Sequence, residues 1–150
     1  MSMGSSLINY TLVYDNLELI ISEGADVPHI AKDNAPTFTI PGLTVTGLAA
    51  PSRGASETSV WRIAVAPGTA GVPHSVDREE IFVALAGRAV ATVAGCEQPV
   101  EAGEALIVPA GETFDLANPH EEPFEAVAVM PVGGRATIPG EAPFVPPWAE

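Results

Sequence analysis

The sequence has little positive charge. Its 150 residues include 6 Lys and Arg against 19 Asp and Glu, and the formal net charge is −13 at pH 7. Binding to nucleic acid requires clustered Lys or Arg that neutralise phosphates, and an anionic membrane surface repels a chain of this charge. We therefore expect neither nucleic acid nor a membrane among the partners of this acidic protein.

Cysteine is nearly absent from the sequence, because Cys96 is the only one. A single cysteine excludes an internal disulfide and a cysteine-rich zinc site. Cys96 lies in the segment Gly95-Cys96-Glu97, which is typical of a hairpin turn. We expect an exposed, unreactive thiol at this position.

Long apolar runs are also missing. No run approaches the roughly 20 apolar residues that a membrane-spanning helix needs. The first residues, Met-Ser-Met-Gly-Ser-Ser, lack the charged start and apolar core of a signal peptide. The location expected from these features is the cytoplasm.

Helical periodicity is weak, because no segment longer than about 10 residues has apolar residues at helical spacing. Short apolar runs instead alternate with turn residues, among 14 Gly and 15 Pro. The predicted strands are residues 7–13, 17–21, 37–40, 43–48, 57–66, 79–85, 88–93, 105–108, 114–117 and 124–130. A short helix over 8–21 is an alternative to the first two, although Asn9, Asn16 and β-branched residues weaken it. This pattern predicts an all-β sandwich or barrel.

The chain length fits one domain with a single core. We expect the barrel over residues 31–138, an N-terminal arm over 1–30 and a proline-rich C-terminal arm over 139–150. The C-terminal arm carries four prolines together with Phe144 and Trp148. Prolines exclude a central strand, and the aromatic residues predict that the arm lies on the barrel or on a partner subunit.

A first motif runs from Gly71 to Gly87 and contains His74, Val76 and Glu80. Residues two apart on a strand point to the same side. His74 and Val76 therefore share a side, and Glu80 begins the next strand close to them. By the same alternation, Phe82 and Ala84 share the face of Glu80, whereas Glu79 points outward.

A second motif contains Gly103, Pro109, Gly111, Phe114 and Asn118. Gly103 and Gly111 suit turns that need a positive φ, and Pro109 suits the end of a strand. Phe114 begins the next short apolar run and cannot coordinate a metal ion.

Together the two motifs resemble those of the cupin superfamily, in its small, single-domain, RmlC-like form. The resemblance implies a double-stranded β-helix, or jelly-roll, barrel that usually holds one metal ion on three histidines and a glutamate. His74 and Glu80 stand at two of these four positions, whereas Val76 and Phe114 stand at the positions of the other two histidines. Cupins of this kind are often homodimers, and we expect a homodimer here.

The metal site is therefore degenerate. Two ligands are too few for a zinc site and fall short of the two-histidine, one-carboxylate set of non-haem iron. We expect no tightly bound cofactor. A divalent ion such as Zn, Fe, Mn or Ni would need His74 and Glu80 with a further ligand, and the candidates are His120 and His29.

The resemblance and the lost ligands together predict that an apolar cavity replaces the metal site and binds a small organic molecule. Its predicted apolar walls are Trp61, Val76, Phe82 and Phe114, and its predicted polar groups are His74 and Glu80. Three alternatives stay open. In the first, side chains simply fill the barrel, and His74 and Glu80 form a buried hydrogen-bonded pair. In the second, the protein is an isomerase or cyclase that uses this pair as acid and base, and in the third it is a metal-dependent cupin, either a dioxygenase or an isomerase, with a reduced ligand set. Whether the protein is an enzyme is left open by the sequence.

Overall fold

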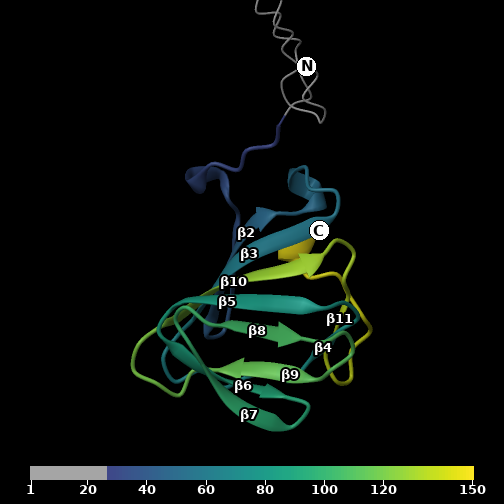
Figure 1. Cartoon of the computed structure of the whole chain (residues 1–150). Helices are drawn as coiled ribbons and strands as arrows, with labels where there is room; N and C mark the ends of the chain where they lie inside the picture. Colours follow the sequence, from purple (N-terminus) through teal and green to yellow (C-terminus); the bar gives the residue numbers. More distant parts are fainter. Residues whose placement is uncertain (1–26) are drawn as a thin grey trace, which may run out of the picture.

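The computed structural model describes residues 27–150, and this part of the chain is an all-β barrel (Figure 1). Its strands are β1 (Thr37–Ile40), β2 (Leu43–Ala49), β3 (Thr58–Val65), β4 (Ser75–Val76), β5 (Glu80–Ala86), β6 (Arg88–Val93), β7 (Cys96–Glu101), β8 (Ala105–Val108), β9 (Phe114–Ala117), β10 (Phe124–Pro131) and β11 (Ala136–Thr137). The strands predicted at 7–13 and 17–21, the helical alternative over 8–21 and most of the predicted N-terminal arm lie outside the described residues.

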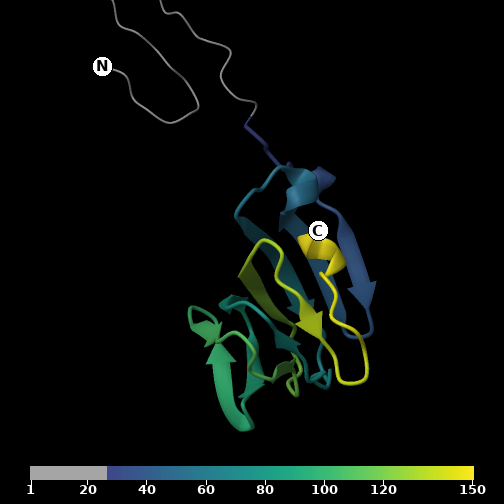
Figure 2. The same ribbon diagram turned by 90° about the vertical axis from the view of Figure 1, so that its right-hand side faces the viewer.

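The strands form a jelly roll. The larger sheet has six strands in the order β1-β2-β3-β10-β5-β8, a second sheet has three in the order β7-β6-β9, and β11 pairs with β4. All of these pairings are antiparallel, and Figure 2 shows the barrel from the side. The helical segments of the described part are 3₁₀ turns of 3 residues each, so none of them is long enough to cross a membrane.

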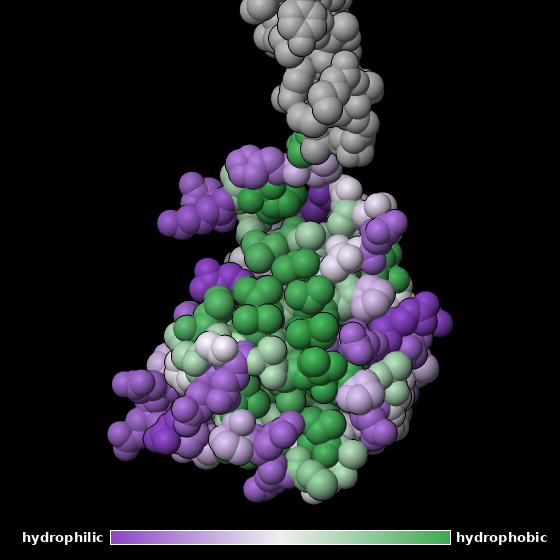
Figure 3. Space-filling view, in the orientation of Figure 1, coloured by the Kyte–Doolittle hydropathy of each residue, from purple (hydrophilic) through white to green (hydrophobic). Residues whose placement is uncertain are grey.

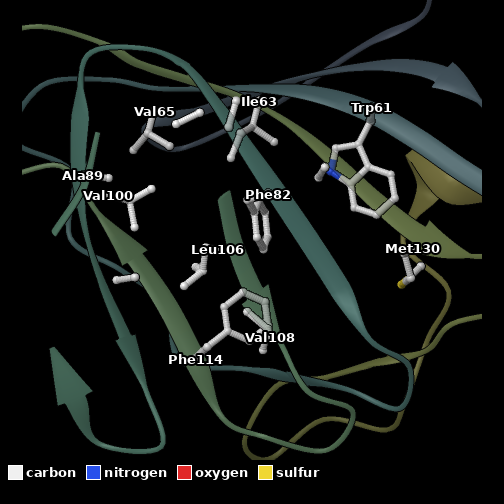
Figure 4. Close-up of a cluster of buried hydrophobic side chains, with 14 of the residues drawn as sticks. Trp61, Ile63, Val65, Phe82, Ala89, Val100, Leu106, Val108, Phe114 and Met130 are labelled. Carbon is white, nitrogen blue, oxygen red and sulfur yellow. The ribbon is translucent and has the colours of Figure 1, made fainter. Parts of the chain in front are cut away.

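The core forms because side chains alternate along each strand. In β10, Phe124, Ala126, Ala128 and Met130 are buried, whereas the residues between them are partly exposed. Side chains from the six-stranded and three-stranded sheets meet in one cluster (Figure 4). Burial of this apolar surface is the main term that stabilises the barrel.

Four predicted strands have the observed bounds, those at 37–40, 88–93, 105–108 and 114–117. The assignment of Cys96 to a hairpin turn was wrong, because β7 begins at this residue and pairs with β6. The turn consists of Ala94, with φ 50°, and Gly95, with φ 80°, as a two-residue hairpin loop requires. Cys96 is exposed, as expected.

The motif glycines lie at the corners of the barrel. Gly103 has φ 90° and Gly111 has φ 81°, which confirms the prediction that these turns need positive φ. Gly87, between β5 and β6, has φ 71°, and a Cβ atom there would collide with the carbonyl oxygen of Pro123. A side chain at position 87 would therefore strain the corner that joins the two sheets.

The C-terminal strap, residues 139–150, lies on its own barrel. The Glu150 carbonyl oxygen accepts hydrogen bonds from Ser52, at 3.1 Å from the backbone nitrogen and 2.5 Å from Oγ. The Ser59 hydroxyl donates to the Ala149 carbonyl oxygen at 3.2 Å. Phe144 forms a β-bridge with Ala136, which lies just before the strap.

The outer face of the larger sheet carries apolar side chains on β5 and β8. Val83 and Leu85 on β5 are 40% and 48% exposed, and Ile107 on β8 is 58% exposed. In Figure 3 apolar side chains form a continuous band across the face that the six-stranded sheet presents in Figure 1. An apolar surface of this kind marks a place where another molecule can pack.

Candidate functional site

Backbone pairing brings the two motifs together. The His74 N–H donates to the Phe114 carbonyl oxygen at 3.0 Å, and the Phe114 N–H donates to the His74 carbonyl oxygen at 2.8 Å. The two rings pack with their centroids 4.3 Å apart. The first histidine position of the cupin pattern and the position taken by phenylalanine are therefore direct neighbours.

Val76 and Phe114 are part of the barrel interior. Val76 is 5% exposed and pairs with Ala136 through β4 and β11. Phe114 is 1% exposed, and its ring centroid lies 5.7 Å from that of Phe82. Figure 4 shows Phe82 and Phe114 directed into the same interior from β5 and β9. Val76 and Phe114 therefore contribute apolar surface to the barrel interior.

A cavity of about 230 Å³ lies inside the barrel. All six residues named from the sequence line it: Trp61, His74, Val76, Glu80, Phe82 and Phe114. Exposed Ile40 and Val72 also belong to the lining, so the cavity reaches the surface on their side. Within residues 27–150, His74 and Glu80 are the only ionisable side chains in the lining.

Glu80 lies in a mainly apolar part of the cavity lining. The side chain begins β5 and is 5% exposed, as alternation with exposed Glu79 predicts. Its Oε2 atom is buried and has no hydrogen-bond partner within residues 27–150. Desolvation raises the pKa of Glu80 from 4.5 to about 8, because burial disfavours the charged form.

His74 has a defined tautomer. Its Nδ1 lies 2.8 Å from the carbonyl oxygen of Val72, and since a carbonyl can only accept, Nδ1 carries the proton. In the neutral ring Nε2 is then an acceptor. No hydrogen bond joins His74 to Glu80 within the described residues, so the bonded pair considered from the sequence is not formed.

The C-terminal strap and the residues before it supply part of the cavity wall, which the sequence did not reveal. Ile138, Phe144, Pro146 and Trp148 line the cavity. The Trp148 ring packs on Trp61, with centroids 6.4 Å apart. Its buried Nε1 has no hydrogen-bond partner in the described part. The two aromatic residues in a proline-rich tail were the available signal.

Arg53 anchors the strap. Its Nε donates to the Leu48 carbonyl oxygen at 2.9 Å, and its Nη2 donates to the Trp148 carbonyl oxygen at 2.7 Å. Hydrogen bonds from a charged donor are stronger than neutral ones. Arg53 therefore holds the strap, and with it Trp148, against β2 and β3.

We expect Arg53→Ala to lower the free energy of unfolding by about 2 kcal/mol, because it removes two charged hydrogen bonds, one to Trp148 of the strap and one to Leu48 of β2. Urea unfolding measures this value. The control is Arg62→Ala, whose ion pair with Glu125 spans 3.8 Å at exposed side chains and should change stability by less than about 1 kcal/mol. Equal effects of the two substitutions would contradict the anchoring role.

The residues that line the cavity do not provide the metal-ligand set that the cupin pattern implies. His29 is exposed, and neither His29 nor His120 lines the cavity. Among residues 27–150, no three His, Cys, Asp or Glu side chains gather in a way that could hold a metal ion. The ligand set that required His120 or His29 beside His74 and Glu80 is not assembled in this part.

Comparisons with known proteins bear on the same segment. A family model described as "Cupin domain" matches residues 61–130. Among solved structures, the polyketide cyclase RemF from Streptomyces resistomycificus is similar, with a TM-score of 0.68, 17% identity, and coverage of 78% of this chain and 88% of that one. No protein in the curated set matches.

Two further structures share the fold. A sugar phosphate isomerase from Silicibacter pomeroyi, described as from a cupin superfamily, has a TM-score of 0.63 at 18% identity. The match covers 76% of this chain and 83% of that one. Salicylate 1,2-dioxygenase from Pseudoaminobacter salicylatoxidans has a TM-score of 0.61 at 17% identity. The match covers 71% of this chain and 31% of the dioxygenase chain. These similarities concern the fold.

Proposed function

We propose that the barrel, which contains the segment 61–130 matched by the cupin-domain model, binds a small organic molecule without a tightly bound metal ion. The observation that carries this proposal is the cavity of about 230 Å³, which has apolar and aromatic walls and only His74 and Glu80 as ionisable groups within the described residues. Apolar concave sites with few polar groups are the usual form of small-molecule sites.

The donor set supports the absence of a tightly held metal. Zinc sites use three or four protein ligands, and the cavity offers His74 and Glu80. Val76 and Phe114 would leave the remaining coordination to water or to the ligand itself. We derive no chemical step through a metal from this arrangement.

We expect a one- or two-ring aromatic compound that binds the protein to lose at least about tenfold in affinity when Leu116 becomes Trp. Leu116 lines the cavity on β9, and the larger ring would occupy the space that the ligand needs. Isothermal titration calorimetry with a panel of such compounds measures the loss.

The matched control for this substitution is Leu85→Trp on the outer face of the sheet, where the side chain is 48% exposed. It should bind as the wild type does. Two results would oppose the proposal: no compound of the panel binding the wild type, or equal binding by Leu116→Trp and the wild type.

An acid/base enzyme is the second candidate, favoured by the raised pKa of Glu80, about 8, and by the presence of His74 in the same cavity lining. In an enolisation, His74 would take the proton from a carbon next to a carbonyl, and Glu80 would give its proton to the carbonyl oxygen. The product is the enol, which an isomerase or cyclase can use. Exchange of that carbon's proton with deuterated solvent, followed by NMR, should be faster with wild type than with His74→Ala; equal rates would remove this candidate.

The homodimer and the three-part division of the chain at residues 30 and 138 are also part of the proposal. The apolar outer face, with exposed Val83, Leu85 and Ile107, supports a homodimer, because a patch of this kind can face its own copy across a twofold axis. Light scattering on the purified protein measures the mass, and a monomer at micromolar concentration would oppose a stable dimer.

A further inference from the structure

The cavity offers no positive charge to an anionic ligand. No Lys or Arg belongs to its lining within residues 27–150. Arg53 is committed to the Leu48 and Trp148 carbonyl oxygens, and Arg62 is exposed and paired with Glu125. A carboxylate or phosphate entering the barrel would lose its hydration without gaining a cation.

Glu80 lacks a hydrogen-bond partner for its buried Oε2 atom within residues 27–150. The side chain is 5% exposed. A buried polar atom without a partner costs free energy and is a reason to look for an absent ligand. In the neutral form that burial favours, the carboxyl group both donates and accepts one hydrogen bond or more.

His74 also lines this cavity and carries a complementary group. The Val72 carbonyl oxygen fixes its proton on Nδ1, which leaves Nε2 to accept. The cavity thus contains an acid hydrogen and a ring nitrogen lone pair. A hydroxyl group has the matching chemistry for both, because its oxygen can accept from Glu80 and its hydrogen can be donated to His74.

The walls indicate the rest of the ligand. The rings of Phe82 and Phe114 pack 5.7 Å apart on one side, and those of Trp61 and Trp148 pack 6.4 Å apart on another. Figure 4 shows Phe82, Phe114 and Trp61 around a common interior. Aromatic side chains favour stacked or edge-on rings. A cavity of about 230 Å³ is below the range of roughly 300–1,000 Å³ for drug-sized ligands, so one or two rings fit.

We propose that the cavity selects a neutral aromatic molecule of one or two rings, held by a hydroxyl group between His74 and Glu80. This inference rests on the proposed small-molecule function and adds the chemical class of the ligand. It assigns Glu80 as the donor to the ligand oxygen and His74 as the acceptor of the ligand proton. Carboxylates of the same ring size are excluded by the lack of a cation.

The test is calorimetric binding at neutral pH of phenol and 2-naphthol, each compared with its methyl ether and with the corresponding carboxylate, benzoate or 2-naphthoate. We expect the better of the two hydroxyl compounds to bind about tenfold or more tightly than its ether or carboxylate, because an unpaired buried polar group has this cost. Glu80→Gln, which keeps a donor and an acceptor, should retain the preference. Glu80→Leu should bind the hydroxyl compound and its ether equally.

The outcomes separate this inference from the function on which it depends. If none of the six compounds binds, the small-molecule function and this inference both fail. If an ether or a carboxylate binds as tightly as its hydroxyl counterpart, the inference fails and the function stands. A preference that persists in Glu80→Leu also overturns the role of Glu80, and circular dichroism of both variants establishes that they are folded.

Discussion

The double variant Val76→His with Phe114→His is expected to bind about one divalent metal ion per chain, whereas the wild type binds far less. The substitutions place two imidazoles beside His74 and Glu80 and give four protein ligands, as zinc prefers. The geometry is favourable because a β-bridge joins the backbones of His74 and Phe114. The two substituted positions, 76 and 114, also line the same cavity as Glu80. Zinc titration followed by metal analysis measures the gain.

Controls for this gain are available in the same chain. Each single substitution gives three ligands and should bind more weakly than the double variant. Adding Glu80→Leu to the double variant should weaken binding again, because it removes the only carboxylate in the lining of the described part. A folded double variant that takes up no zinc would contradict the assignment of Val76 and Phe114 to ligand positions.

Glu80→Gln is expected to stabilise the protein at alkaline pH by several kcal/mol. Desolvation raises the pKa of Glu80 from 4.5 to about 8, so the unfolded chain releases this proton at lower pH than the folded chain does. Wild-type stability from this group is fully present below pH 4.5 and is lost as the pH rises to about 8. At about 1.36 kcal/mol for each pKa unit, the full loss is on the order of 5 kcal/mol.

Glutamine keeps the shape of the side chain and does not titrate. The difference in free energy of unfolding between the variant and the wild type should therefore be small at pH 4 and largest near pH 8–9. Urea unfolding across this range measures it. The control is Glu79→Gln at the exposed neighbouring position, which should show a pH-independent difference below about 0.5 kcal/mol. A pH-independent difference for Glu80→Gln would show that the carboxyl group is solvated in the folded protein.

Much of the barrel was predictable because its signals are local. Period-two alternation placed Glu80, Phe82 and Ala84 on one face, and all three are buried. Turns that need positive φ leave glycines in the sequence, as at Gly103 and Gly111. The sequence of the two motifs is therefore enough to indicate which of their side chains face the barrel interior.

The remaining features depend on contacts between distant residues. Strands β4 and β11 have only 2 residues each, too few to show any periodicity. In β7 the side chains are mostly exposed and one is a proline, Pro99, so no apolar pattern marks it. The partner of Arg53 is a carbonyl oxygen 95 residues away, and the lack of a bond between His74 and Glu80 is a matter of side-chain placement.

Native mass spectrometry of the protein, purified without a histidine tag and incubated with both zinc and 2-naphthol, tests the central claim most directly. One spectrum reports whether the folded chain carries an organic molecule, a metal ion or neither. The account predicts a folded species with one added 2-naphthol and no stoichiometric zinc. A species with one zinc per chain and no organic ligand would contradict it.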